Sequence, residues 1–134
     1  NIDVVGTEVG GGGLNATLRD LARFGEMMRK DGDGVVPKAV VDDIRGGGDK
    51  AAFAKAGYDL LKGASYRDMW WVTHNADGAF MARGVYGQRT YIDPKAEMVI
   101  VRYASNPVAS NSANDPVTIP AFEALAKQLM THPD

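Results

Sequence analysis

The sequence predicts an α+β domain, an antiparallel β-sheet flanked by helices, and two observations carry this prediction. Apolar residues recur at helical spacing in the first third of the chain and again near its end. Between them, from Met69 to Arg102, short runs of aromatic and β-branched residues are separated by turns rich in Asn, Asp, Gly and Pro, a pattern typical of antiparallel strands. We therefore expect residues 1–134 to form a single segment of such a domain, with a last helix lying back on the sheet.

The helices are predicted from the residues at their ends. Thr17, followed three residues later by Asp20, forms a capping box, so a helix begins there and continues to a run of Asp and Gly. Shorter helices are expected over 37–45, opened by a proline, and over 50–56, preceded by a capping aspartate. The final helix is expected over 120–131.

Three or four strands are expected between these helices. Trp70 and Trp71 lie in the first, over 69–73, and must point to opposite faces of the sheet. The run 79–92 reads as one strand whose interior glycines mark a bulge or a close backbone approach by a ligand. The run 98–103 is almost continuously apolar, as expected for a central strand covered on both faces. Loops are expected over 63–67 and 105–115.

Composition narrows the class of function. The formal net charge of −2 gives no electrostatic reason to expect nucleic acid or an anionic membrane as a partner. No apolar run is long enough to span a bilayer and no signal peptide is visible, which favours the cytoplasm without fixing the compartment. The chain has no cysteine, and its two histidines are far apart, so we expect neither a metal site nor a cofactor.

Several motifs resemble one known family. Residues 12–24, GGLNATLRDLARF, resemble a helix start, commonly G-G-L-x-S-T-A-x-D-L-A-R-F, of the serine β-lactamase-like hydrolases. That family includes penicillin-binding proteins, class C β-lactamases and related esterases. Residues 84–94, GVYGQRTYIDP, and 98–101, MVIV, are similar to its C-terminal strands. The runs 70–75, WWVTHN, and 80–84, FMARG, are more similar still to the branch that degrades nylon oligomers.

The resemblance implies acyl transfer, and it implies that the chain is only part of such an enzyme. In the family, a serine in an S-x-x-K motif attacks an amide or ester, and a tyrosine of a Y-x-N or Y-x-S motif moves protons. No serine of this chain has a lysine three residues later, and neither tyrosine motif is present. We therefore expect a C-terminal part whose partners are the missing N-terminal part and a small amide or ester substrate, and whose isolated chain is inactive.

The site residues are transferred by the same resemblance. The family's K-T-G motif falls at residues 82–84, Ala-Arg-Gly, where only Gly84 matches, and the lost lysine favours the esterase and amide-hydrolase branch over β-lactam recognition. The following residue, Val85, is implied to donate its backbone N–H to the oxyanion hole, and Gly84 to let the strand approach the acyl group. Trp71 is implied to form a wall of the substrate pocket, with Tyr86 bordering the site.

Each assignment has a simpler structural alternative. Trp71 could belong to the core, Val85 could be an ordinary strand residue, and Tyr86 could be a strand tyrosine with a solvated hydroxyl. His74 could act as a general base, but no motif supplies an acidic partner, and the family's chemistry needs no histidine.

Two functions follow from these assignments. The first is the oxyanion strand and one pocket wall of a serine hydrolase for linear amides or esters. The second is a non-catalytic binding or structural module derived from the same fold. Homodimer formation is open in either case.

Overall fold

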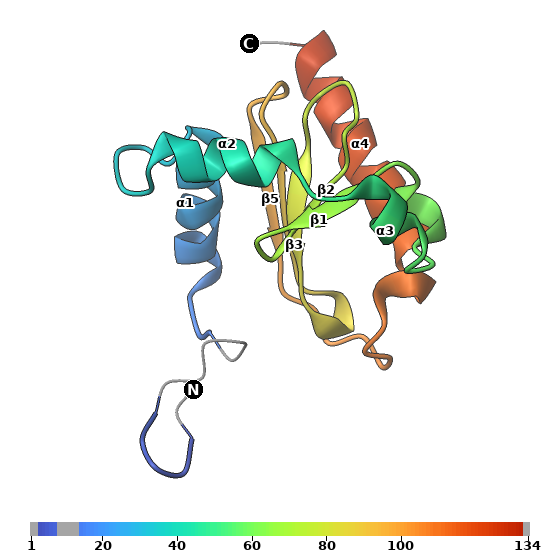
Figure 1. The fold of residues 1–134 in the computed structure, drawn as a ribbon. Coiled ribbons are helices and arrows are strands. Elements are labelled where there is room, and N and C mark those ends of the chain that lie inside the picture. The colour runs from blue at the N-terminus through green and yellow to red at the C-terminus, as the bar shows by residue number, and fades with distance from the viewer. Residues whose placement is uncertain (1–2, 8–13, 133–134) are drawn as a thin grey trace.

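In the computed structural model, which describes residues 3–7 and 14–132, a five-stranded antiparallel sheet lies between two helical layers (Figure 1). The strands follow one another in chain order, so each pairs with its neighbour in sequence. Helices α1 and α2 cover one face, and α4 lies on the other (Figure 1). The predicted α+β class is confirmed. The strands are β1 (Ser65–Arg67), β2 (Trp70–Val72), β3 (Phe80–Arg83), β4 (Arg89–Asp93) and β5 (Met98–Arg102).

The first helix begins where the capping box predicts it. Thr17 is the N-cap of α1, and its Oγ1 accepts a hydrogen bond of 3.1 Å from the amide of Asp20. Asp49 opens α3 in the same way, with its carboxylate accepting from the amides of Ala51 and Ala52. The α-helices are α1 (Leu18–Arg29), α2 (Lys38–Gly46), α3 (Lys50–Ala54) and α4 (Asp115–Thr131), and the 3₁₀ turns are η1 (Asp59–Leu61), η2 (Val85–Gly87) and η3 (Asn111–Ala113).

The run 79–92 is a hairpin, so the prediction of one strand was wrong. β3 and β4 pair antiparallel, with Arg83 opposite Arg89, and the 3₁₀ turn η2 joins them. The two glycines serve this reversal of the chain. Gly87 has a φ of 93°, a conformation that costs glycine little, and a Cβ at Gly84 would lie 2.8 Å from the Cβ of Gln88 across the turn.

Two further boundaries and the position of one strand in the sheet differ from the prediction. β1 lies within the predicted loop 63–67, because its three residues are too few to show an alternating pattern. α4 begins at Asp115 within the predicted loop 105–115, since a proline in the first helical turn loses no intrahelical hydrogen bond. β5 is an edge strand of the described sheet, because only β4 pairs with it there, although both its faces are half-buried.

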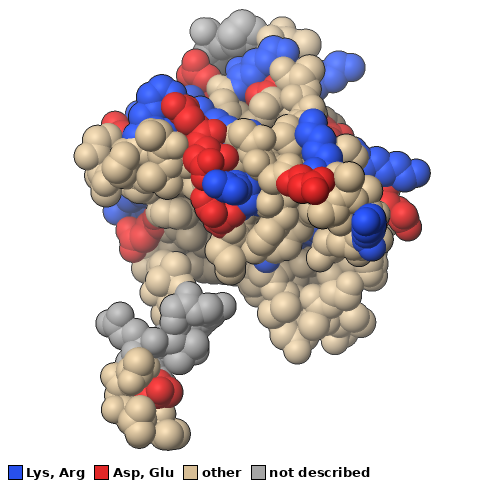
Figure 2. Space-filling view, viewed as in Figure 1, with Lys and Arg blue, Asp and Glu red and all other residues tan. Residues whose placement is uncertain are grey.

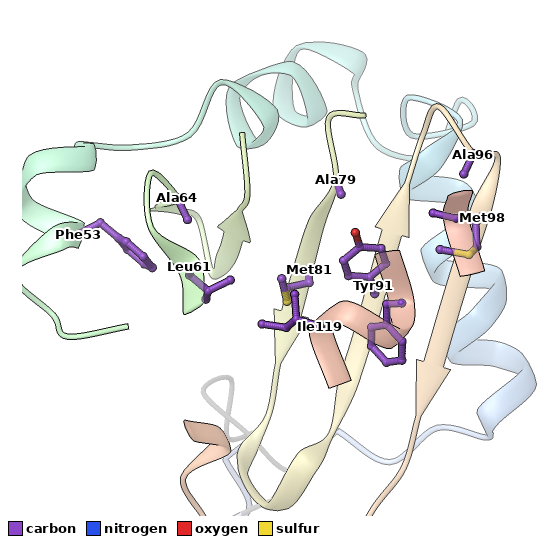
Figure 3. Packing of buried hydrophobic residues seen from close by; sticks show 11 residues of the cluster. Phe53, Leu61, Ala64, Ala79, Met81, Tyr91, Ala96, Met98 and Ile119 are labelled. Carbon is purple, nitrogen blue, oxygen red and sulfur yellow. The ribbon is translucent and has the colours of Figure 1, made fainter. Parts of the chain in front are cut away.

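The two adjacent tryptophans point to opposite faces of the sheet, as expected. Trp70 is buried against Phe80 on the α1 and α2 side, whereas Trp71 packs beside the cluster under α4. That second cluster contains Tyr91 of β4 and Phe122 of α4, whose rings lie 5.4 Å apart (Figure 3 shows several of its members).

Charged side chains of both signs are interspersed over the face shown in Figure 2. Arg67 pairs with Asp43 and Arg45 with Asp31, so positive and negative groups lie together. Within the described part of the chain, no helix is both long and apolar enough to cross a membrane.

The packing of α1 on the sheet depends on a glycine. A Cβ at Gly25 would lie 2.5 Å from Val99 Cγ1 and 3.2 Å from Thr90 Cγ2, so the helix approaches β4 and β5 closely only because no side chain is present. We predict that Gly25→Ala lowers the free energy of unfolding by about 1–3 kcal/mol, because overpacking outweighs the better helix propensity of alanine. Urea denaturation measures this.

Gly46→Ala is the matched control, since a Cβ there meets nothing within 4 Å. It should leave stability unchanged or raise it by up to about 1 kcal/mol. Equal behaviour of the two variants would contradict the close approach at Gly25.

Candidate functional site

The tip of the β3–β4 hairpin carries most of the predicted site residues. Gly84 is extended, Val85 begins the 3₁₀ turn, and Tyr86 has a left-handed backbone with φ 58°. A non-glycine residue in this conformation costs free energy and persists only where the surroundings hold it. Val85 is 59% exposed and Tyr86 46% exposed, so the turn lies at the surface.

The backbone amides of this turn differ in their hydrogen bonds. The amide of Gly84 donates to Gln88 O at 3.0 Å, and the amide of Tyr86 donates to Ala109 O at 3.1 Å. Among the described residues, no hydrogen bond of the Val85 amide is found. The Val85 N–H therefore has no hydrogen-bond partner among the described residues, and it belongs to an exposed residue.

Two hollows meet at the hairpin tip. The larger, of about 620 Å³, is lined by Trp71, Gly84, Gln88, Leu21 and Tyr103 among others. The smaller, of about 250 Å³, is lined by Trp71, Gly84 and Val85 together with Tyr58 and residues 109–112. Trp71 and Gly84 thus border both hollows, and Tyr86 lines neither.

The loop between β5 and α4 fixes the hairpin tip from one side. Asn106 N donates to Tyr86 O at 3.0 Å, and Asn111 Nδ2 donates to Gly84 O at 2.9 Å. The Gln88 side chain also bonds both backbone groups of Ala104. Because these bonds fall on every second residue of the tip, at positions 84, 86 and 88, contacts from outside the hairpin help to set its conformation.

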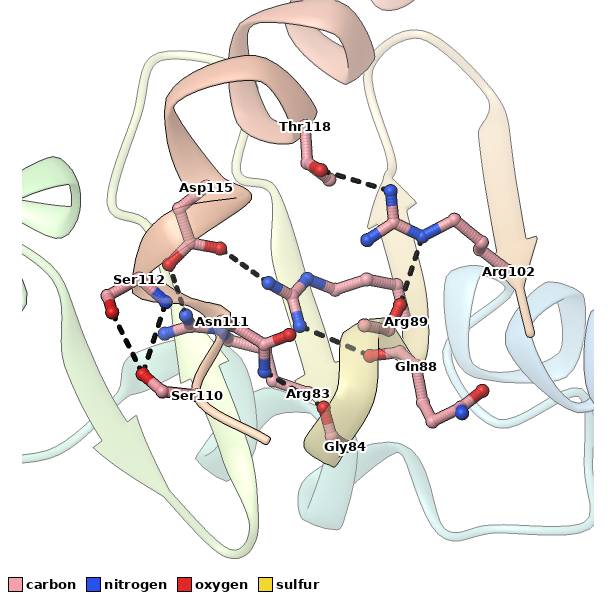
Figure 4. A network of polar contacts seen from close by, with 11 residues as sticks. Arg83, Gly84, Gln88, Arg89, Arg102, Ser110, Asn111, Ser112, Asp115 and Thr118 are labelled. Carbon is pink, nitrogen blue, oxygen red and sulfur yellow. Dashed lines mark hydrogen bonds and ion pairs between the residues drawn. The ribbon is translucent and has the colours of Figure 1, made fainter. Parts of the chain in front are cut away.

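An ion-pair network lies beneath the tip (Figure 4). The carboxylate of Asp115, the first residue of α4, accepts from Arg83 and Arg89, both at 2.5 Å, and all three side chains are buried. Burial, together with the positive charge of Arg83, lowers the pKa of Arg89 to about 10, so Arg89 stays charged at neutral pH. The Arg83 guanidinium also lies over the rings of Tyr58 and Trp71, at 5.2 and 5.4 Å.

A second polar contact joins a serine at the start of β1 to a histidine that follows β2. Ser65 Oγ lies 2.7 Å from His74 Nε2 and accepts a 3.0 Å hydrogen bond from Gly48 N. The pair has the composition of a nucleophile and a base, but Ser65 is fully buried and cannot meet a substrate. Burial and, to a smaller extent, the charge of Lys50 lower the pKa of His74, so its imidazole is neutral at neutral pH. Through the bond from Gly48, the Ser65–His74 pair joins the α2–α3 connection to the sheet.

The structure thus brings Trp71, Gly84 and Val85 together and leaves Tyr86 beside them. Sequence reasoning missed the support beneath them: Arg83, Arg89, Asn111 and Asp115. These residues have no motif relationship, and only the pairing of β3 with β4 and the packing of α4 bring them together. No group of His, Asp or Glu in the described ranges is arranged to hold a metal ion.

Comparison with known proteins identifies relatives that match most of the chain. No family model matches the chain. The chain is 34% identical over 111 residues to the 6-aminohexanoate-dimer hydrolase of Paenarthrobacter ureafaciens, an alignment that covers 79% of the chain. A solved structure from Bacillus anthracis, described provisionally as a 6-aminohexanoate-dimer hydrolase, superposes with a TM-score of 0.78 at 35% identity over 98% of the chain. The chain belongs to the 6-aminohexanoate-dimer hydrolase family.

The chain spans only about a third of these relatives, 28% of the Paenarthrobacter hydrolase and 34% of the Bacillus structure. The match to a 6-aminohexanoate-dimer hydrolase structure over nearly the whole chain extends to the sheet and both helical layers. It therefore confirms the resemblance that the sequence motifs indicated.

Among the polar residues of this chain, Asp115 is predicted to be the one whose replacement lowers the free energy of unfolding most. Asp115→Ala should lower the free energy of unfolding by about 3–5 kcal/mol, because it leaves two buried guanidinium groups without a counter-charge. Asp43→Ala, which breaks the exposed pair with Arg67, should cost at most about 1 kcal/mol. Chemical denaturation of both variants checks this, and similar losses would show that burial of the network has no energetic consequence.

His74 is predicted to make stability depend on pH. Its pKa is lower in the folded protein than the unfolded value near 6.5, so the unfolded state binds more protons as the pH falls. Stability should therefore be full above about pH 7 and decline below about pH 6.5. Thermal unfolding from pH 7.5 to 5 should show a smaller decline in His74→Gln and, because Lys50 contributes to the shift, in Lys50→Gln. Wild-type decline in both variants would exclude His74 as the cause.

Proposed function

We propose that the chain is the C-terminal part of a serine hydrolase that cleaves linear amides or esters through an acyl-enzyme. Its family relatives are named as hydrolases of the 6-aminohexanoate dimer, which is a linear amide, and this supports that substrate class. The chain has no S-x-x-K motif, and its Ser65 is buried. The nucleophilic serine, lysine and tyrosine therefore come from another part of the enzyme, and the isolated chain is inactive.

The role of this segment is to stabilise the negative charge that develops on the attacked carbonyl oxygen. The single observation that carries the proposal is the Val85 N–H, which belongs to an exposed residue of the hairpin tip and has no hydrogen bond among the described residues. A preorganised backbone donor needs no particular side chain and is worth about 2.7–4 kcal/mol in the transition state. The Ala-Arg-Gly sequence in place of K-T-G is therefore compatible with this role.

Trp71 supplies a wall of the substrate pocket. It borders both hollows beside Gly84, and the Arg83 guanidinium lies over its ring. An indole face of this kind suits the methylene chain of a linear amide, since burying apolar area stabilises the complex by about 25 cal/mol per Å². No metal or cofactor enters this mechanism.

A non-catalytic module is the second candidate, favoured by the absence of the serine motif from this sequence. A serine-directed acylating probe separates the two. Labelling of the protein that carries this segment, on a serine outside residues 1–134, supports the enzyme. A protein that contains no such serine and never labels supports the module.

Val85→Pro tests the oxyanion role directly. Proline removes the N–H, and the turn accepts it because Val85 begins a 3₁₀ turn and Gly84 before it is extended, with φ −98° and ψ 164°. In the full-length hydrolase, kcat for an amide substrate should fall by about 10²–10³-fold, the usual effect of losing one oxyanion donor.

Val85→Ala keeps the N–H and is the control, with kcat expected within about twofold of wild type because the donor belongs to the backbone. Steady-state kinetics on a linear amide dimer and a p-nitrophenyl ester give both values. Wild-type kcat in Val85→Pro would refute the oxyanion assignment.

A further inference from the structure

We infer that Asn111 is a positioning residue for this hydrolase, holding the peptide group whose N–H is the oxyanion donor. The inference rests on the proposed function of Val85. Asn111 begins η3, 27 residues from Gly84, and its side-chain Nδ2 donates to Gly84 O at 2.9 Å.

The argument depends on the geometry of one peptide bond. The carbonyl of Gly84 and the N–H of Val85 belong to the same planar group, and in a trans peptide they point in opposite directions. A hydrogen bond that fixes the carbonyl therefore also fixes the direction of the N–H. It polarises the group as well, which strengthens the N–H as a donor.

Among the described residues, the bond from Asn111 Nδ2 to Gly84 O is the one hydrogen bond found for the Gly84–Val85 peptide. The neighbouring bonds hold other peptide groups: Gly84 N to Gln88 O, Tyr86 N to Ala109 O, and Asn106 N to Tyr86 O. These bonds keep the turn folded, but none of them is made by the C=O or N–H of the Gly84–Val85 peptide. Gly84 allows this peptide plane to rotate, because without a Cβ its ψ angle meets few steric limits.

Asn111 is itself held in place. Its backbone carbonyl accepts a 2.9 Å hydrogen bond from Asn114 N, next to Asp115, whose carboxylate pairs with Arg83 and Arg89. Its side-chain Oδ1 is buried without a hydrogen-bond partner among the described residues, so the bond to Gly84 O is the side chain's only one there. The orientation of its amide is determined, because the Gly84 carbonyl can only accept and must face the NH₂ group. Figure 4 shows Asn111 between the start of α4 and the hairpin tip.

The experiment measures kcat and KM in the full-length hydrolase carrying Asn111→Ala. We expect kcat to fall about tenfold, less than on losing the donor, because the N–H remains but is no longer aimed. KM should stay within about twofold, since the donor acts in the transition state more than on the bound substrate. Asn111→His, whose ring Nδ1 can donate from the same position, should recover part of kcat.

Asn114→Ala is the matched control, because Asn114 ends the same 3₁₀ turn, its side chain makes no capping hydrogen bond to α4, and it lines neither hollow. It should keep wild-type kcat. If Asn111→Ala fails to fold, Asn111→Asp, which has the same volume and no donor at neutral pH, replaces it and should show the same loss of kcat.

A double variant makes the test specific. If Asn111 acts through the Val85 N–H, adding Asn111→Ala to Val85→Pro should cause no further loss of kcat, because the group that Asn111 orients is already absent. Equal losses in both backgrounds, a change in KM alone, or wild-type kcat in Asn111→Ala would overturn this inference. Wild-type kcat in Val85→Pro would instead refute the oxyanion proposal, so the two failures are distinguishable.

Discussion

The ion pairs of Asp115 with Arg83 and Arg89 are the interaction on which the arrangement around the hairpin tip depends. One buried carboxylate pairs with two guanidinium groups from adjacent strands, and it is carried by the first residue of α4. Burying charges is costly, so such a network contributes more to a defined geometry than to net stability. Here it fixes where α4 begins relative to the ends of β3 and β4.

The loop before α4 is positioned by the same ion pairs, because it ends at Asp115. Its residues bond the backbone of Tyr86 and Gly84, and the left-handed conformation of Tyr86 is held by them. A surface turn with a free amide would ordinarily fluctuate. In this fold the loop before α4 bonds it from one side, which suits the oxyanion role that we propose for Val85.

The sequence was informative where local rules apply. Thr17 and Asp20 give the start of α1 correctly, and the adjacent tryptophans give the two faces of the sheet, because capping and strand alternation depend on nearby residues. The sequence of the hairpin in 79–92 resembles a single strand, because a 3₁₀ turn with a non-glycine in a left-handed conformation leaves little local signal. Trp71, Gly84 and Val85 came only from resemblance. Asp115 and Asn111 act on residues about 30 positions away, which no spacing rule predicts.

The order of the strands has a consequence for assembly of the domain. Every strand pairs with the next one along the chain, and Arg67 faces Trp70 with only two residues between them. Closing such short loops costs little conformational entropy, whereas the contact of α1 with β4 and β5 joins segments some 70 residues apart. Forming the sheet therefore costs little conformational entropy during folding, whereas docking α1 on the sheet at Gly25 costs more.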